Sequence, residues 1–129
     1  MQIKFSSVMV ADQEAALDFY TTVLGFEKMA DIHMGEFRWL TVTSPDGIEG
    51  VELVLEPMGF APARTYQKAM YDAGVTAIAL ITQDIAADVA RLKARGVIFR
   101  SEPTNMGPII SAVFEDTCGN LVNLVQPLV

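Results

Sequence analysis

Apolar residues follow two periods along this chain, and the two periods succeed each other in the same order twice. Residues 2–10 largely alternate between apolar and polar positions, which predicts a strand. Apolar side chains then recur at helical spacing over residues 16–23, which predicts an amphipathic helix. Three further strands are predicted at 26–31, 36–44 and 50–56.

The second series has the same layout. A strand is predicted at 75–81, and Ile85, Val89 and Leu92 form one apolar stripe of a helix. Strands are again predicted near 97–100, at 109–115 and at 121–126. In both series an aspartate at the N-cap position precedes the helix and a glycine follows it, and these pairs are Asp12 with Gly25 and Asp84 with Gly96.

The two series lie about 72 residues apart, and such a repeat indicates two copies of one structural unit. Each copy reads as βαβββ, so we expect a single domain of modules 1–57 and 75–129 joined by a linker at 58–74, with a short helix at 64–72. One module is too small to bury a good core alone. The modules should therefore associate, and the surface between equivalent strands is the natural place for a ligand.

Composition and charge narrow the classes of function. The chain has 129 residues, of which 51% are hydrophobic and 19% charged, as in globular domains. The net charge of −7 and the absence of a Lys/Arg cluster argue against nucleic acid as a partner. No apolar run is long enough to span a membrane, no signal peptide is apparent, and one cysteine excludes an internal disulfide, so we expect a cytoplasmic protein with no membrane partner.

Two segments of the sequence resemble a known family. Residues 12–26, with Asp12, Ala16, Phe19-Tyr20 and Leu24-Gly25-Phe26, are similar to the opening signature of the glyoxalase/bleomycin resistance/extradiol dioxygenase superfamily, whose fold is also called vicinal oxygen chelate. Residues 114–120 resemble its closing turn. The resemblance implies an α+β fold in which two βαβββ modules form a U-shaped half-barrel. It also implies a small-molecule ligand in the concavity and a homodimer.

The resemblance also locates the positions at which relatives hold a metal ion. These positions fall at Phe5, Glu52, Ala77 and Asn123. A catalytic divalent site needs about three His, carboxylate or thiolate ligands, and only Glu52 qualifies. The sole histidine, His33, cannot replace two missing ligands. We therefore expect neither a metal nor another cofactor.

Glu52 is the main candidate for chemistry. By the period of two, Val51, Leu53 and Leu55 should face the helices, and Glu52 should face the concavity. A carboxylate in an apolar cleft has a raised pKa unless it is paired, and it can act as a general base or bind a cation. Alternatively, Glu52 pairs with Arg38 on the neighbouring strand and is structural.

The other candidate residues can likewise have either a functional or a structural role. Trp39 either contacts a planar ligand or fills the core or a dimer contact, and Asn123 either orients a ligand or is a satisfied interior amide. The linker either forms an adaptable lid or packs as an ordinary crossover. Cys118 lacks a neighbouring histidine, which argues against a nucleophile. The predicted ligand-binding residues are Phe5, Met9, Trp39, Glu52, Glu56, Phe60, Phe114 and Asn123.

The sequence thus favours a family member without the usual metal ligands that binds a small hydrophobic or aromatic molecule, with a cationic group as one option for Glu52. The alternative is an enzyme of the same superfamily, a lyase or a dioxygenase-like protein, that uses Glu52 or an atypical metal site. A module for protein–protein contact is the third hypothesis.

Overall fold

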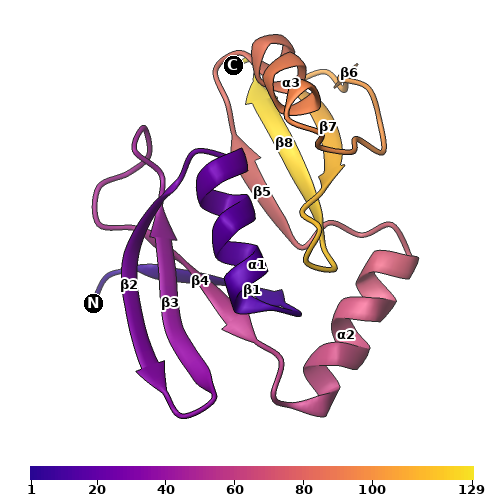
Figure 1. Ribbon diagram of the computed structural model, residues 1–129. Coiled ribbons are helices and arrows are strands. Elements are labelled where there is room, and N and C mark those ends of the chain that lie inside the picture. The colour runs from indigo at the N-terminus through magenta and orange to yellow at the C-terminus, as the bar shows by residue number, and fades with distance from the viewer. The chain divides into compact units, whose positions relative to one another are not determined.

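The computed structural model describes all residues, 1–129, and divides into two compact units, Met1–Thr65 and Tyr66–Val129 (Figure 1). The division falls within helix α2 (Ala61–Asp72). Each unit contains one four-stranded sheet and one helix that follows its first strand. The prediction of an α+β fold built from two similar βαβββ modules is confirmed.

The first unit consists of β1 (Phe5–Val10), α1 (Gln13–Asp18), the π-helical turn η1 (Phe19–Val23), β2 (Glu27–Met34), β3 (Phe37–Thr43) and β4 (Glu52–Pro57). Its strands are ordered β1-β4-β3-β2. The β1–β4 pair is parallel, whereas β4–β3 and β3–β2 are antiparallel. The chain therefore returns to pair its first strand with its last.

Helix α1 begins where the sequence predicts. The Asp12 side chain accepts a hydrogen bond from the Ala15 backbone N–H (3.0 Å), and Gly25 ends the segment at φ +89°. The second half is a π-helix, because the Leu24 N–H donates to the Phe19 carbonyl five residues earlier. The Thr21 hydroxyl donates to the Leu17 carbonyl (2.6 Å) and so competes for an acceptor of the ordinary helical ladder.

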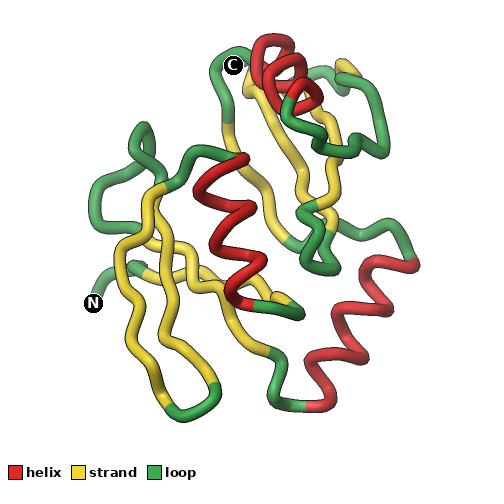
Figure 2. Tube along the Cα trace, in the orientation of Figure 1, coloured by secondary structure: helices red, strands yellow, loops and turns green.

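The second unit consists of β5 (Ile78–Ile81), α3 (Ile85–Ala94), β6 (Thr104–Asn105), β7 (Ile109–Glu115) and β8 (Leu121–Pro127), with the strand order β5-β8-β7-β6 (Figure 2). Asp84 caps α3 by accepting from the Ala87 N–H (3.1 Å), and Gly96 follows it at φ +87°. The predicted stripe of α3 is buried, as expected for the face that covers the sheet: Ile85, Val89 and Leu92.

Three sequence predictions need correction. Residues 97–100 form no strand, because Phe99 makes only an isolated bridge to Phe114, and the short edge strand β6 lies further along the chain. In the β5–β8 ladder Asn123 lies beside Ala79 rather than Ala77, so the registration was wrong by two residues. Helix α2 starts at Ala61 rather than 64, since Pro62 is tolerated in a first turn. No helix combines the length and apolar character needed to cross a bilayer.

Candidate functional site

The strand register separates the first sheet into two faces. Arg38 reaches Glu14 of α1, so its side chain lies on the helix-covered face. Trp39 is the next residue of β3 and therefore lies on the opposite face. By the pairing of the strands, this second face also carries Phe5, Ile32, Met34, Thr41 and Glu52, and we call it the open face. Glu52 thus points away from α1, as the alternation of side chains along its strand predicts.

Glu52 is almost buried on the open face and is paired. Its side chain accepts a hydrogen bond from the Thr41 hydroxyl (2.6 Å) and forms an ion pair with Lys4 (3.2 Å). The Thr41 hydroxyl, and after it Lys4, lower the pKa of Glu52 against the opposing effect of burial. Glu52 is therefore the paired case, for which no raised pKa is expected.

The alternative partner named for Glu52 is wrong. Arg38 belongs to the helix-covered face, where it binds Asp31 and Glu14. Glu52 is consequently an ionised, charge-balanced carboxylate and a weak base. A cationic ligand would have to compete with Lys4, whose side chain is 50% exposed.

The aromatic residues of the open face remain accessible. The rings of Phe5 and Trp39 meet edge to face with centroids 5.3 Å apart. Phe5 is 46% exposed, Ile32 57% and Met34 64%, and Ile32 lies directly beside Trp39 in the β2–β3 ladder. This arrangement presents a continuous apolar surface with two aromatic rings.

The remaining candidates of the first unit lie at its margins. Met9 and Glu56 are neighbours in the β1–β4 ladder and half-buried. Glu56 accepts a hydrogen bond from the Ser7 hydroxyl (3.4 Å). Phe60 precedes α2 and is 71% exposed. By the alternation of their strands, Met9 and Glu56 lie on the same face as Phe5 and Glu52, whereas Phe60 lies outside the sheet.

In the second unit the structure separates Phe114 from Asn123. Phe114 is fully buried and contacts Phe99, with ring centroids 5.5 Å apart. It shares a face with Gln126, which accepts a hydrogen bond from the Ile85 N–H of α3, so Phe114 belongs to the helix-covered core. Its assignment to a ligand cleft is wrong, because residues 114 and 123 point to opposite faces of the β7–β8 pair.

Asn123 lies on the other face of the second sheet. Its amide oxygen accepts a hydrogen bond from the Ser111 hydroxyl (2.6 Å). The amide group is half-buried among small apolar neighbours such as Ala79 and Val113. The oxygen is thus satisfied within the protein, which leaves the amide N–H groups as the atoms that can address a ligand.

Part of the predicted linker is fixed within the second unit. The Gln67 amide donates to the Cys118 carbonyl (3.1 Å) and to the Asn120 side chain (3.2 Å). The Tyr71 hydroxyl donates to Glu115 and accepts from Arg100. These contacts bind the second half of α2 to the closing turn. Sequence reasoning missed Gln67 and Tyr71, because a helix-to-turn contact between distant residues leaves no local pattern.

The donor set does not fit the divalent metal site of the family. Phe5, Ala77 and Ala79 have no donor atom, and the oxygen of Asn123 is held by Ser111. No group of three or more His, Cys, Asp or Glu side chains is arranged to hold a metal ion. We therefore derive no reaction step through a metal.

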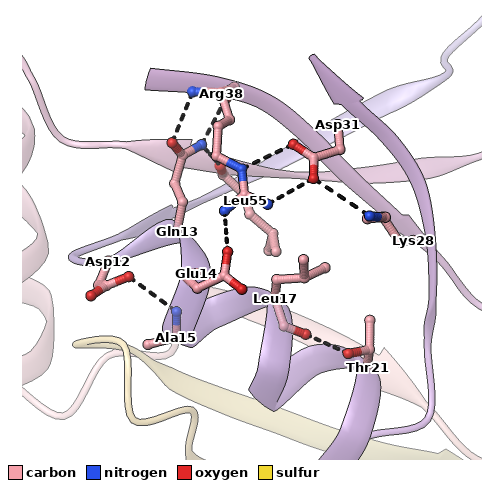
Figure 3. A network of polar contacts seen from close by, with 10 residues as sticks. All are labelled: Asp12, Gln13, Glu14, Ala15, Leu17, Thr21, Lys28, Asp31, Arg38 and Leu55. Carbon is pink, nitrogen blue, oxygen red and sulfur yellow. Dashed lines mark hydrogen bonds and ion pairs between the residues drawn. The ribbon is translucent and has the colours of Figure 1, made fainter. Parts of the chain in front are cut away.

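A network of charges fixes the helix-covered side of the first unit (Figure 3). The Arg38 guanidinium donates two hydrogen bonds to Asp31 (2.9 and 2.7 Å) and a third to Glu14 (2.5 Å). The hydrogen bonds from Arg38 to Asp31, with a smaller contribution from Lys28, lower the pKa of Asp31 to about 2. Asp31 and Arg38 thereby join β2 and β3 at their centre.

The Asp31 carboxylate should make stability depend on pH at the acid end. Its folded pKa of about 2 lies below the ordinary value of 3.8, so its contribution is complete above 3.8 and is lost as pH falls towards 2. We expect Asp31→Asn to lower the free energy of unfolding at neutral pH, and the gap to the parent protein to close between about pH 4 and pH 2. Urea unfolding across this range measures the gap, and the exposed-site variant Asp46→Asn is the control. A gap that stays constant with pH would contradict the assignment.

Comparisons with known proteins agree with this architecture. A sequence profile described as the Glyoxalase/Bleomycin resistance protein/Dioxygenase superfamily matches residues 2–124. The uncharacterized protein YurT of Bacillus subtilis (strain 168) is 48% identical over 126 residues, which cover 98% of this chain and 99% of that protein.

Solved structures give the same result. The crystal structure of UcmS2 is 32% identical with a TM-score of 0.84 and covers 97% of both chains. That of TnmS3, described as an antibiotic binding protein from Streptomyces sp. CB03234, is 35% identical with a TM-score of 0.77 and covers 98% of this chain and 96% of its own. The profile spans nearly the whole chain, and the relatives share its full length. The chain therefore belongs to the glyoxalase/bleomycin resistance protein/dioxygenase superfamily.

Proposed function

We propose that this protein binds a small, flat, mainly hydrophobic molecule on the open face of the first sheet. The observation that carries the proposal is the Phe5–Trp39 ring pair, in which Phe5 is exposed and Trp39 half-buried, with the exposed Ile32 beside Trp39. Two rings set edge to face offer a third ring both stacking and edge contacts. Apolar surface that gathers in one place, rather than as scattered single residues, is typical of a ligand-binding or interaction site.

The similarity to TnmS3 supports binding rather than turnover. That protein is described as an antibiotic binding protein, and it is similar to this chain over nearly its whole length. Sequestration requires no catalytic group, which agrees with the donor set at Phe5, Glu52, Ala79 and Asn123. By the same analogy we propose that the protein works as a homodimer, whose size is measurable by light scattering.

The single tryptophan provides a direct test. Trp39 is the only tryptophan of the chain, so its fluorescence reports on the open face alone. We expect the neutral aromatic probe N-phenyl-1-naphthylamine to quench Trp39 saturably by energy transfer. Ile32→Ala should weaken binding by about threefold to tenfold, because it removes part of the apolar contact area, worth about 0.8 kcal/mol per methylene.

The matched control is Ile48→Ala. Ile48 lies in the β3–β4 loop and is 78% exposed, so it loses the same atoms outside the open face. We expect this variant to bind the probe as the parent does. Quenching that never saturates, or equal losses in the two alanine variants, would contradict the proposal. Competition against the bound probe then ranks antibiotics and metabolites as natural ligands.

The enzyme hypothesis receives less support. It relies on Glu52 as a general base, and the lowered pKa of this carboxylate reduces its basicity at neutral pH. Both carboxylate oxygens are also engaged, one with Thr41 and one with Lys4. Unchanged probe binding in Glu52→Gln would agree with a structural role for this residue, which ties β3, β4 and the N-terminal segment together.

A further inference from the structure

A cavity lies at the end of the first unit where two strands separate. β3 and β4 pair directly only at Thr41↔Val54 and Val42↔Leu53. Beyond this point a side chain of α1, Gln13, bridges them by bonding Arg38 of β3 and the Leu55 carbonyl of β4 (Figure 3). Residues from the start of β3 and the end of β4, Phe37 and Pro57 among them, line a cavity of about 270 Å³.

The walls of this cavity combine apolar and charged groups. Val10, Phe37, Pro57 and Met58 supply apolar surface. Val10 and Met58 are buried, and the Phe37 ring packs against the backbone of Gly59. The polar lining residues are Asp12, Gln13, Glu14, Glu36, Arg38 and Arg64.

Most of these polar groups already have partners. Arg38 is bound to Asp31 and Glu14, which also accounts for the Glu14 carboxylate. One oxygen of Asp12 accepts the Ala15 N–H. By contrast, the side chains of Arg64 and Glu36 take part in no hydrogen bond or ion pair, with each other or with any other residue.

A cation and an anion that line one small cavity without meeting suit a ligand with both charges. We propose that this cavity binds a free α-amino acid with an apolar side chain. Arg64 receives the carboxylate, which the planar guanidinium binds through two parallel hydrogen bonds. Glu36, together with the free oxygen of Asp12, receives the ammonium group, and the side chain lies against Phe37 and Met58.

The size and surroundings of the cavity restrict the ligand. Its volume of about 270 Å³ lies just below the range of about 300–1,000 Å³ for small-molecule sites, which favours a metabolite over a larger drug-like compound. The site is separate from the Phe5–Trp39 surface in its polar groups and in its ligand chemistry. The amino-acid proposal can therefore be confirmed or refuted independently of the proposed function.

Isothermal titration calorimetry with three probes of one shape tests the charge requirement. L-Leucine carries both charges, 4-methylpentanoate lacks the ammonium group, and 3-methylbutylamine lacks the carboxylate. We expect saturable binding of leucine and at least about tenfold weaker binding of each analogue, because each leaves one charged group of the site unpaired. Absence of leucine binding at millimolar concentration, or equal affinity for the three probes, overturns the proposal.

Two charge-neutral variants identify the residues. Arg64→Gln should abolish the preference for leucine over 3-methylbutylamine, and Glu36→Gln should abolish the preference over 4-methylpentanoate. Both side chains are exposed and unpaired, so the variants should fold normally, which circular dichroism verifies. Glu49→Gln removes an exposed carboxylate of the β3–β4 loop, outside the cavity, and should leave all three affinities unchanged. Preferences that survive in both cavity variants overturn the assignment.

Discussion

Replacing Asp116 with alanine should destabilise the protein by about 3–5 kcal/mol, because the side chain holds the closing turn from inside. Asp116 is fully buried, and one carboxylate oxygen accepts the backbone N–H groups of Cys118 (2.7 Å) and Asn120 (3.0 Å). The other oxygen accepts the Asn120 side-chain amide (2.8 Å). Alanine would leave these buried donors without their acceptor. Guanidinium unfolding, followed by circular dichroism and fluorescence together, measures the loss.

Two further variants make this expectation specific. Asp116→Asn retains an oxygen for the two backbone donors and loses the bond to the Asn120 side chain, so we expect a smaller loss of about 1–2 kcal/mol. Asp46→Ala removes an exposed aspartate from the turn before β4 and should change stability by less than about 0.5 kcal/mol. Equal effects of Asp116→Ala and Asp46→Ala would contradict the buried role of Asp116.

The elements that local chemistry determines could be predicted from the sequence. Asp12 and Asp84 cap their helices as expected, and Gly25 and Gly96 follow them with positive φ. These features depend on residues within one or two turns of each other, so a single sequence displays them. The order of elements then follows from the repeat. The π-helical second half of the first helix could not be predicted in this way, because it depends on which backbone carbonyl each N–H group bonds.

The candidate site was less predictable because it depends on strand register. Glu52 and Arg38 lie on adjacent strands, and the sequence allows them to pair, but the register puts them on opposite faces. Phe114 was assigned to a cleft for the same reason. A shift of one position moves a strand residue to the other face of the sheet, and Phe114 is in fact buried in the core. Thr41 and Lys4, the actual partners of Glu52, come from a neighbouring strand and from the segment before β1.

The gap between β3 and β4 gives the second large prediction, which concerns Gln13. Its amide donates to the Arg38 carbonyl (2.7 Å) and the Leu55 carbonyl (2.9 Å) and accepts from the Arg38 N–H (3.0 Å). It thus replaces the ladder bonds that the separated strands cannot make. Gln13→Ala should therefore cost about 2–4 kcal/mol of unfolding free energy, despite the good helix propensity of alanine.

Comparison with its neighbour and with a charged analogue separates this role from helix formation. Glu14→Ala alters the same helical turn at a side chain that is 78% exposed, and it should cost less than about 1 kcal/mol. Gln13→Glu retains an acceptor for the Arg38 N–H but directs a carboxylate at two carbonyl oxygens, so at neutral pH it should destabilise at least as much as alanine. Protonation restores one donor, and part of this loss should be recovered at low pH. A glutamate tolerated at neutral pH would mean that Gln13 fills space and does not bridge the strands.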